Sequence, residues 1–139
     1  AQTGFPFTVI AGQDRSMTAI GQDRAVVAGR PYGAGACGKR APCVDFLNRE
    51  SFALPAIGEF GNVGKNALTG PSSVTWDMGF SKDFPFKERY KVQVRAEFFN
   101  LLNHTRFNNP NSNASASAFG SITSAADPRI GQLALKVTF

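Results

Sequence analysis

The stretch Arg129-Ile-Gly-Gln-Leu-Ala-Leu-Lys-Val-Thr-Phe139 alternates between apolar and polar side chains. One set of alternate positions holds Leu133, Leu135, Val137 and Phe139. The other set holds Gln132, Ala134, Lys136 and Thr138. Because the side chains of a β-strand point to opposite faces in turn, the pattern predicts a strand over residues 129–139 with one apolar face. Such a face meets the core of a soluble sandwich, or lipid when the strand belongs to a membrane barrel.

Further stretches with strand-like patterns lie at residues 5–11, 74–84 and 88–102. With the first stretch they predict an all-β chain of about four antiparallel strands, separated by long loops at 12–73 and 103–128. The expected apolar face includes Trp76, Met78, Phe80, Val92, Val94 and Leu133. The expected polar face includes Gln93, Arg95, Glu97, Gln132 and Lys136. A polar face of this kind is the solvent face of a soluble sheet or the wet lining of a wide barrel.

The overall composition favours strands over helices. Of the 139 residues, 42% are hydrophobic and 18% are charged, and the 13 Phe and 14 Gly suit strands and turns. No apolar run approaches the roughly 18 residues that a transmembrane helix needs, so a membrane location requires a barrel. The connection at Pro85-Phe-Lys87 is short whereas the loops are long, an asymmetry typical of outer-membrane barrels. The net charge of +5 comes from scattered Lys and Arg, which argues against a nucleic-acid surface.

Two cysteines, Cys37 and Cys43, lie close together in a stretch rich in Gly and Pro. This spacing predicts a loop disulfide formed in an oxidising compartment, and the alternative is a pair of free thiols. Two thiolates and the single distant His104 do not complete a tetrahedral metal site. His104 also lacks the nucleophile motif of a hydrolase, so we predict no catalytic, cofactor-binding or metal-binding residues.

The last strand also carries a pattern of its own. Gln132-x-Ala134-x-x-Val137-x-Phe139, with Leu135 inside it, resembles the terminal assembly signal of bacterial outer-membrane barrels, where Gly usually stands at the position of Ala134. Other phrases resemble the last part of the barrel of TonB-dependent outer-membrane receptors: Gly4-Phe-Pro-Phe-Thr-Val9, Phe60-Gly-Asn-Val-Gly-Lys-Asn66, Arg95-Ala-Glu-Phe-Phe-Asn-Leu-Leu-Asn-His104 and Asp127-Pro-Arg129. The receptors most similar are the Oar-like group, which carry an amino-terminal carboxypeptidase-regulatory-like domain.

The resemblance implies a bacterial outer-membrane or extracellular location. It also implies a parent receptor with a plug and a barrel of about 22 strands that imports a large nutrient. Four strands cannot close a barrel when the smallest single-chain barrels have about eight. We therefore expect a non-enzymatic structural subunit, complete in its 139 residues, that is an incomplete barrel segment and closes or extends by pairing with other copies.

The expected assembly is a ring, tube or fibre made of copies of this chain. Lipid or lipopolysaccharide is a further expected partner, and nucleic acid is not. The alternative is that the chain is the C-terminal part of an intact TonB-dependent receptor, in which case the barrel-assembly machinery is also a partner.

Overall fold

The computed structural model describes residues 1–34, 37, 42–86 and 90–139. These residues confirm the predicted all-β class: strands pair antiparallel in small sheets, no barrel closes among them, and their one helical element is the short turn η1 (Arg49–Ser51). The chain divides into two compact units. Unit 1 contains residues 74–105 and 127–139 with Ala1, and unit 2 contains residues 2–73 and 106–126. The sequence had predicted a single segment.

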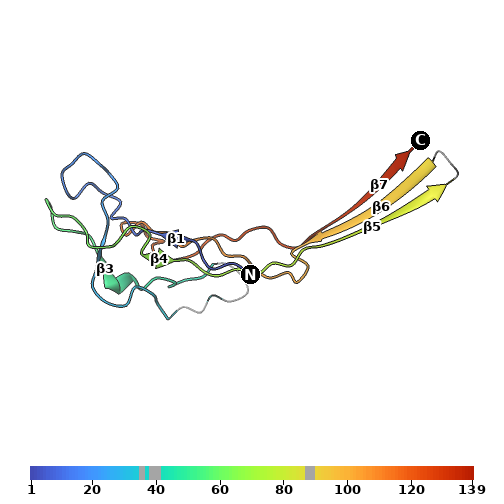
Figure 1. The fold of residues 1–139 in the computed structure, drawn as a ribbon. Helices are drawn as coiled ribbons and strands as arrows, with labels where there is room; N and C mark the ends of the chain where they lie inside the picture. The colour runs from blue at the N-terminus through green and yellow to red at the C-terminus, as the bar shows by residue number, and fades with distance from the viewer. Residues whose placement is uncertain (35–36, 38–41, 87–89) are drawn as a thin grey trace. The chain divides into compact units, whose positions relative to one another are not determined.

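Unit 1 is built on a three-stranded antiparallel sheet in the order β5–β6–β7 (Figure 1). Its strands are β5 (Met78–Phe86), β6 (Tyr90–Phe99) and β7 (Ile130–Thr138). They stand where the sequence predicted strands at 74–84, 88–102 and 129–139. Of the predicted turn Pro85-Phe-Lys87, the first two residues belong to β5 and Lys87 lies outside the described residues. No helix in the described part of the chain is long and apolar enough to cross a membrane.

Asn100 determines where β6 ends. Its φ of 51° is a left-handed conformation that asparagine tolerates better than most residues. The backbone N–H of Asn100 donates to Oδ1 of Asp77 at 2.8 Å, and its side-chain amide bonds the backbone N–H and C=O of His104, each at 3.0 Å. These bonds replace the strand pairing, so β6 stops at Phe99, three residues earlier than the sequence predicted.

The strand predicted at residues 5–11 is only two residues long and belongs to unit 2. β1 (Pro6–Phe7) pairs antiparallel with β4 (Leu68–Thr69) and not with the sheet of unit 1. Beyond β1, successive residues form backbone hydrogen bonds with different segments. The carbonyl oxygen of Val9 accepts from the N–H of Ala25 at 3.1 Å. The N–H of Ile10 donates to the carbonyl oxygen of Ser112 at 2.9 Å, and the N–H of Ala11 donates to that of Asp23 at 2.6 Å. Because its hydrogen bonds are shared among separate segments, this stretch forms no continuous ladder. The long sheet therefore has three strands.

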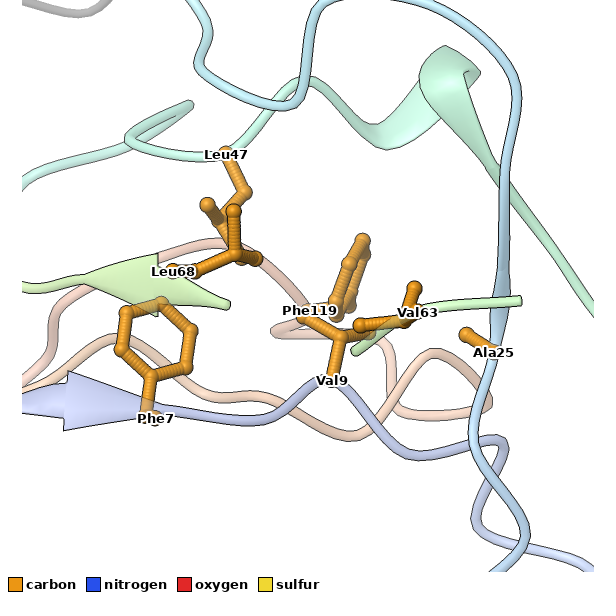
Figure 2. Packing of buried hydrophobic residues seen from close by; sticks show 7 residues of the cluster. All are labelled: Phe7, Val9, Ala25, Leu47, Val63, Leu68 and Phe119. Atoms are coloured by element: carbon orange, nitrogen blue, oxygen red, sulfur yellow. The ribbon is translucent and has the colours of Figure 1, made fainter. Parts of the chain in front are cut away.

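Unit 2 has a hydrophobic core of its own. Buried residues from distant parts of the sequence form one cluster: Phe7, Val9, Ala25, Leu47, Val63, Leu68 and Phe119 (Figure 2). The ring of Phe52 packs edge to face on Phe119, with ring centroids 5.3 Å apart. β2 (Val26–Val27) and β3 (Phe52–Ala53) form a second short antiparallel pair. The ranges predicted as loops thus fold together around buried apolar side chains.

The predicted disulfide between Cys37 and Cys43 is present, with Cα atoms 4.9 Å apart. Cys43 is buried and exchanges two backbone hydrogen bonds of 2.8 Å with Ile122, which is fully buried. One end of the disulfide loop is therefore anchored in unit 2.

Gly61 lies where the chain passes close to Arg24 and Ala25. A Cβ added at Gly61 would overlap the carbonyl oxygens of both residues. We expect Gly61→Ala to lower the free energy of unfolding of unit 2 by about 1–3 kcal/mol, the usual effect of overpacking. A Cβ added at Gly21 would meet no atom within 4 Å, so Gly21→Ala should change it by less than about 0.5 kcal/mol. Resistance of unit 2 to protease in increasing urea measures both variants, and equal losses would contradict the packing argument.

Candidate functional site

The sheet of unit 1 is the candidate functional site because its two faces differ in chemistry. Val94 of β6 pairs with Lys82 of β5 and with Leu135 of β7, and directly paired residues point to the same face. The next residue, Arg95, pairs with Ser81 and Ala134. Since side chains alternate along each strand, these three residues lie on the opposite face.

One face of the sheet is apolar apart from a single lysine. It contains Met78, Phe80, Phe84, Val92, Val94, Ala96, Phe98, Leu133, Leu135 and Val137. All nine residues of β7 are exposed, and the exposed fraction of Leu133 is 81%. Removing apolar surface from water is favourable by roughly 25 cal/mol per Å². The face therefore has a strong tendency to be covered by lipid or by protein.

The opposite face carries charged and amide side chains that bond one another across the strands. Asp83 of β5 forms an ion pair of 2.7 Å with Lys91 of β6. Arg95 lies 3.4 Å from Glu97, and Glu97 also accepts a hydrogen bond from Gln132 of β7. Exposed ion pairs contribute only about 0–1 kcal/mol to stability. Their effect here is to make this face compatible with water.

Lys82 is the exception on the apolar face. Lys82 lies near the end of the strand predicted at 74–84. The observed strand β5 continues to Phe86, so Lys82 lies at the middle of β5. It is flanked by Phe80 and Phe84 on the same strand. A lysine at the bilayer midplane costs about 2–4 kcal/mol, and this cost falls toward the interface. If this face meets lipid, the long side chain of Lys82 favours a depth at which its ammonium group reaches the headgroups.

Among the described residues, β5 and β7 each have an unpaired edge. Each pairs only with β6, so half of the backbone N–H and C=O groups of β5 and β7 have no partner in the sheet. Pro85 is compatible with this position in β5, because a proline without an N–H is tolerated in an outer strand. Long unpaired edges are templates for the addition of another strand.

The structure distributes the predicted site residues over both units. Those on the apolar face of the sheet are Met78, Phe80, Val92, Val94 and Leu133. Trp76 precedes β5, and its carbonyl oxygen accepts a hydrogen bond of 2.8 Å from Leu101. The predicted assembly residues in β7 are Gln132, Ala134, Leu135 and Val137. Phe139 follows β7 and is 91% exposed, and the disulfide belongs to unit 2.

Sequence reasoning missed the carboxylates that shape the loop between Asp14 and Asp23. Asp14 accepts the backbone N–H groups of Thr18 at 3.1 Å and Ala19 at 2.7 Å. Met17 and Ala19 have φ values of 61° and 62°, which are rare for these residue types. The bonds to Asp14 hold this conformation. An Asp followed closely by Ser and Thr is a turn signal that the sequence offered.

Asp23 closes the same loop, and its ionisation makes the loop sensitive to acid. It accepts the backbone N–H groups of Ser16 and Arg15, each at 2.6 Å. The bond from the Ser16 N–H is the main reason that the pKa of Asp23 is lower than its ordinary value of 3.8. Because the pKa of Asp23 is lower in the folded loop than in the unfolded chain, its ionised carboxylate stabilises the fold when the pH is above the unfolded pKa. This stabilisation is lost as the pH falls through the pKa of the folded state. We expect the protection of the Arg15 and Ser16 amides from hydrogen exchange to fall as the pH drops below 3.8.

Two comparisons check this prediction. The Ala25 amide, which donates to the carbonyl oxygen of Val9, should keep its protection over the same range because no carboxylate holds it. In Asp23→Asn the pH dependence at Arg15 and Ser16 should disappear. Protection that falls equally at all three amides would indicate general unfolding and contradict the assignment.

The chain matches a protein-family model. The model described as "Outer membrane beta barrel domain" matches residues 1–132, which is nearly the whole chain and includes all of unit 2 and unit 1 up to Gln132 in β7. No curated protein and no solved structure matches the chain.

Proposed function

Because the chain belongs to the outer membrane beta barrel domain family, we propose that its three long strands form part of the wall of a TonB-dependent receptor. The family places the chain in the outer membrane. The register of β5, β6 and β7 carries the proposal, because it separates an apolar face from a hydrated one. In a barrel the first face meets lipid and the second lines the lumen. The proposed receptor is of the Oar-like group and imports a large nutrient.

The connections between the strands support an orientation. Only residues 87–89 separate β5 from β6, whereas residues 100–129 separate β6 from β7. Outer-membrane barrels have short periplasmic turns and longer extracellular loops. β5 and β7 then run toward the periplasm, and β6 runs outward. In this arrangement lipid and lipopolysaccharide cover the apolar face, and the barrel-assembly machinery inserts the strands.

The sheet needs further strands to become a barrel, since it has three and the smallest single-chain barrels have about eight. In a receptor the pairing strands belong to the same polypeptide. The unpaired edges of β5 and β7 favour a second candidate, in which copies of the chain pair edge to edge. That role is structural and non-enzymatic, and its product is a ring, tube or fibre.

The mass of the particle extracted from the outer membrane distinguishes the two candidates. A denatured polypeptide several times heavier than the 14.9 kDa chain supports the receptor. A particle composed of several 14.9 kDa copies supports the second candidate and overturns the first. A monodisperse 14.9 kDa monomer in buffer without detergent overturns both.

Prolines in β7 test the pairing of its edge directly. Alternate N–H groups of a strand point to opposite neighbours, so one of Ala134 and Leu135 donates toward β6 and the other faces the unpaired edge. Ala134→Pro and Leu135→Pro should both prevent assembly, but only one of them should expose the amides of β6 to hydrogen exchange. Ala134→Val and Leu135→Val keep the N–H and should assemble normally. Normal assembly of either proline variant would contradict strand addition at β7.

A further inference from the structure

Unit 2 contains a pocket of about 220 Å³ that is separate from the sheet of unit 1. It is lined by three segments of unit 2, near residues 2–5, 71–73 and 106–109, together with Ala126. Its volume is below the roughly 300–1,000 Å³ of pockets for drug-sized ligands, so it suits a small ligand with one ring. Because the pocket lies wholly in unit 2, its ligand does not depend on which strands complete the sheet.

Arg106 gives the pocket a cation that forms no ion pair with the described residues. Its guanidinium forms no hydrogen bond or ion pair with the residues that the structure describes. By contrast, Arg15 and Arg49 donate to backbone carbonyl oxygens at 2.8 and 3.0 Å. The backbone of Arg106 is fixed, since its carbonyl oxygen accepts a bond of 2.8 Å from the Ala126 N–H. A planar guanidinium on a fixed backbone matches the two oxygens of a carboxylate.

Two asparagines add amide groups to the same pocket. Asn108 is held by Ser124: its Nδ2 donates to the Ser124 hydroxyl at 2.9 Å, and its backbone N–H donates to the Ser124 carbonyl oxygen at 3.2 Å. These bonds leave Oδ1 of Asn108 able to accept from a ligand. The side chain of Asn109 packs close to the backbone of Gly70: a Cβ added to Gly70 would overlap the Oδ1 atom of Asn109. Side-chain amides both donate to and accept from hydroxyl groups, so this part of the pocket suits a hydroxylated ligand.

Phe5 and Phe107 complete the lining with apolar surface. Phe5 is 63% exposed, and the half-buried Phe107 is fixed by backbone pairing with Ala125. An aromatic ring offers a flat apolar surface to the C–H groups of another ring. A cation, two amides and two aromatic rings therefore line one small pocket.

We propose that this pocket binds a uronic acid, a sugar ring that carries one carboxylate. The carboxylate pairs with Arg106, the hydroxyl groups bond Asn108 and Asn109, and the ring lies against Phe107. The assignment goes beyond the proposed role in the barrel wall, because it gives unit 2 a ligand of its own.

Sodium glucuronate titrated into the full chain in detergent tests the proposal through amide chemical shifts. We expect shifts at Arg106 and Asn109 with a dissociation constant of about 1 mM, in keeping with one ion pair and a few hydrogen bonds. Methyl glucoside lacks the carboxylate and benzoate lacks the hydroxyl groups, so each should bind roughly tenfold more weakly. Equally tight binding of either compound, or the absence of shifts with glucuronate, would overturn the proposal.

A matched pair of variants locates the site. Arg106→Gln should weaken glucuronate binding roughly tenfold. Arg30→Gln removes an exposed arginine of unit 2 outside the pocket lining and should leave binding unchanged. Protection of the Ala126 amide, which bonds the backbone at residue 106, verifies that Arg106→Gln is folded. Unchanged binding in a folded Arg106→Gln variant would also overturn the assignment.

Discussion

Leu133→Arg should lower the free energy of unfolding of the chain in a bilayer by about 2–4 kcal/mol, the range for an arginine near the midplane on a lipid-facing strand. Leu133 is 81% exposed in β7 and pairs with Ala96 on the apolar face. If this face meets lipid, the new guanidinium loses its hydration without gaining a partner. Urea unfolding from lipid vesicles, followed by electrophoretic mobility without heating, measures the difference.

Gln132→Arg is the matched control, since it introduces the same side chain one residue away on the polar face. Gln132 pairs with Glu97, so the added cation faces an opposite charge. Because exposed ion pairs contribute little, we expect a change of less than about 1 kcal/mol. Similar large losses in both variants would contradict the two-faced sheet. Similar small changes would mean that water or protein, and not lipid, covers Leu133.

Leu47→Ala should lower the free energy of unfolding of unit 2 by about 2–5 kcal/mol, the range for a leucine replaced in a packed core. Leu47 is 1% exposed and belongs to the cluster that joins Val9, Val63 and Phe119. Its backbone N–H also donates to the carbonyl oxygen of Gly120 at 3.1 Å, so the cavity forms where separate segments meet. The small space left cannot collapse without moving these segments. Tryptic cleavage in increasing urea measures the loss.

Ile57→Ala provides the comparison, because it removes a side chain of similar size from a residue that is 71% exposed in the same unit. We expect a change of less than about 0.5 kcal/mol. If the two variants lost the same stability, the cluster around Leu47 would not be the core of unit 2.

The sheet of unit 1 was predictable because each strand carries its own signal. Alternation in polarity is local, so it marked the regions of β5, β6 and β7 and the face on which Val94 and Leu135 lie together. The strand ends were less predictable, because they depend on interactions between distant residues. The hydrogen bond from the Asn100 N–H to the Asp77 carboxylate ends β6. No pattern in the sequence around either residue predicts this bond.

Unit 2 could not be predicted because its core has no period. Val9, Leu47 and Phe119 come from three stretches far apart in the sequence that share no common pattern, and only folding brings them together. The strand-like pattern at residues 5–11 did mark a buried stretch, since Phe7 and Val9 are both buried. The pattern identified side chains that are buried, but it did not indicate that this strand pairs with β4. The lining of the pocket was hidden for the same reason, as its residues come from three distant segments.

The packing of residues 106–126 into unit 2 restricts how proteins of this kind can diverge. Phe119 and Ile122 come from the connection between β6 and β7, yet both are buried together with residues of the segment 2–73. Exchanging that connection alone for one from a relative would leave Leu47 and Val9 without their neighbours. Recombination that preserves folding must therefore transfer both segments at once. New ligand preferences in unit 2 should therefore arise in one of two ways. Either residues 2–73 and 106–126 are exchanged together, or single substitutions occur outside the core of unit 2.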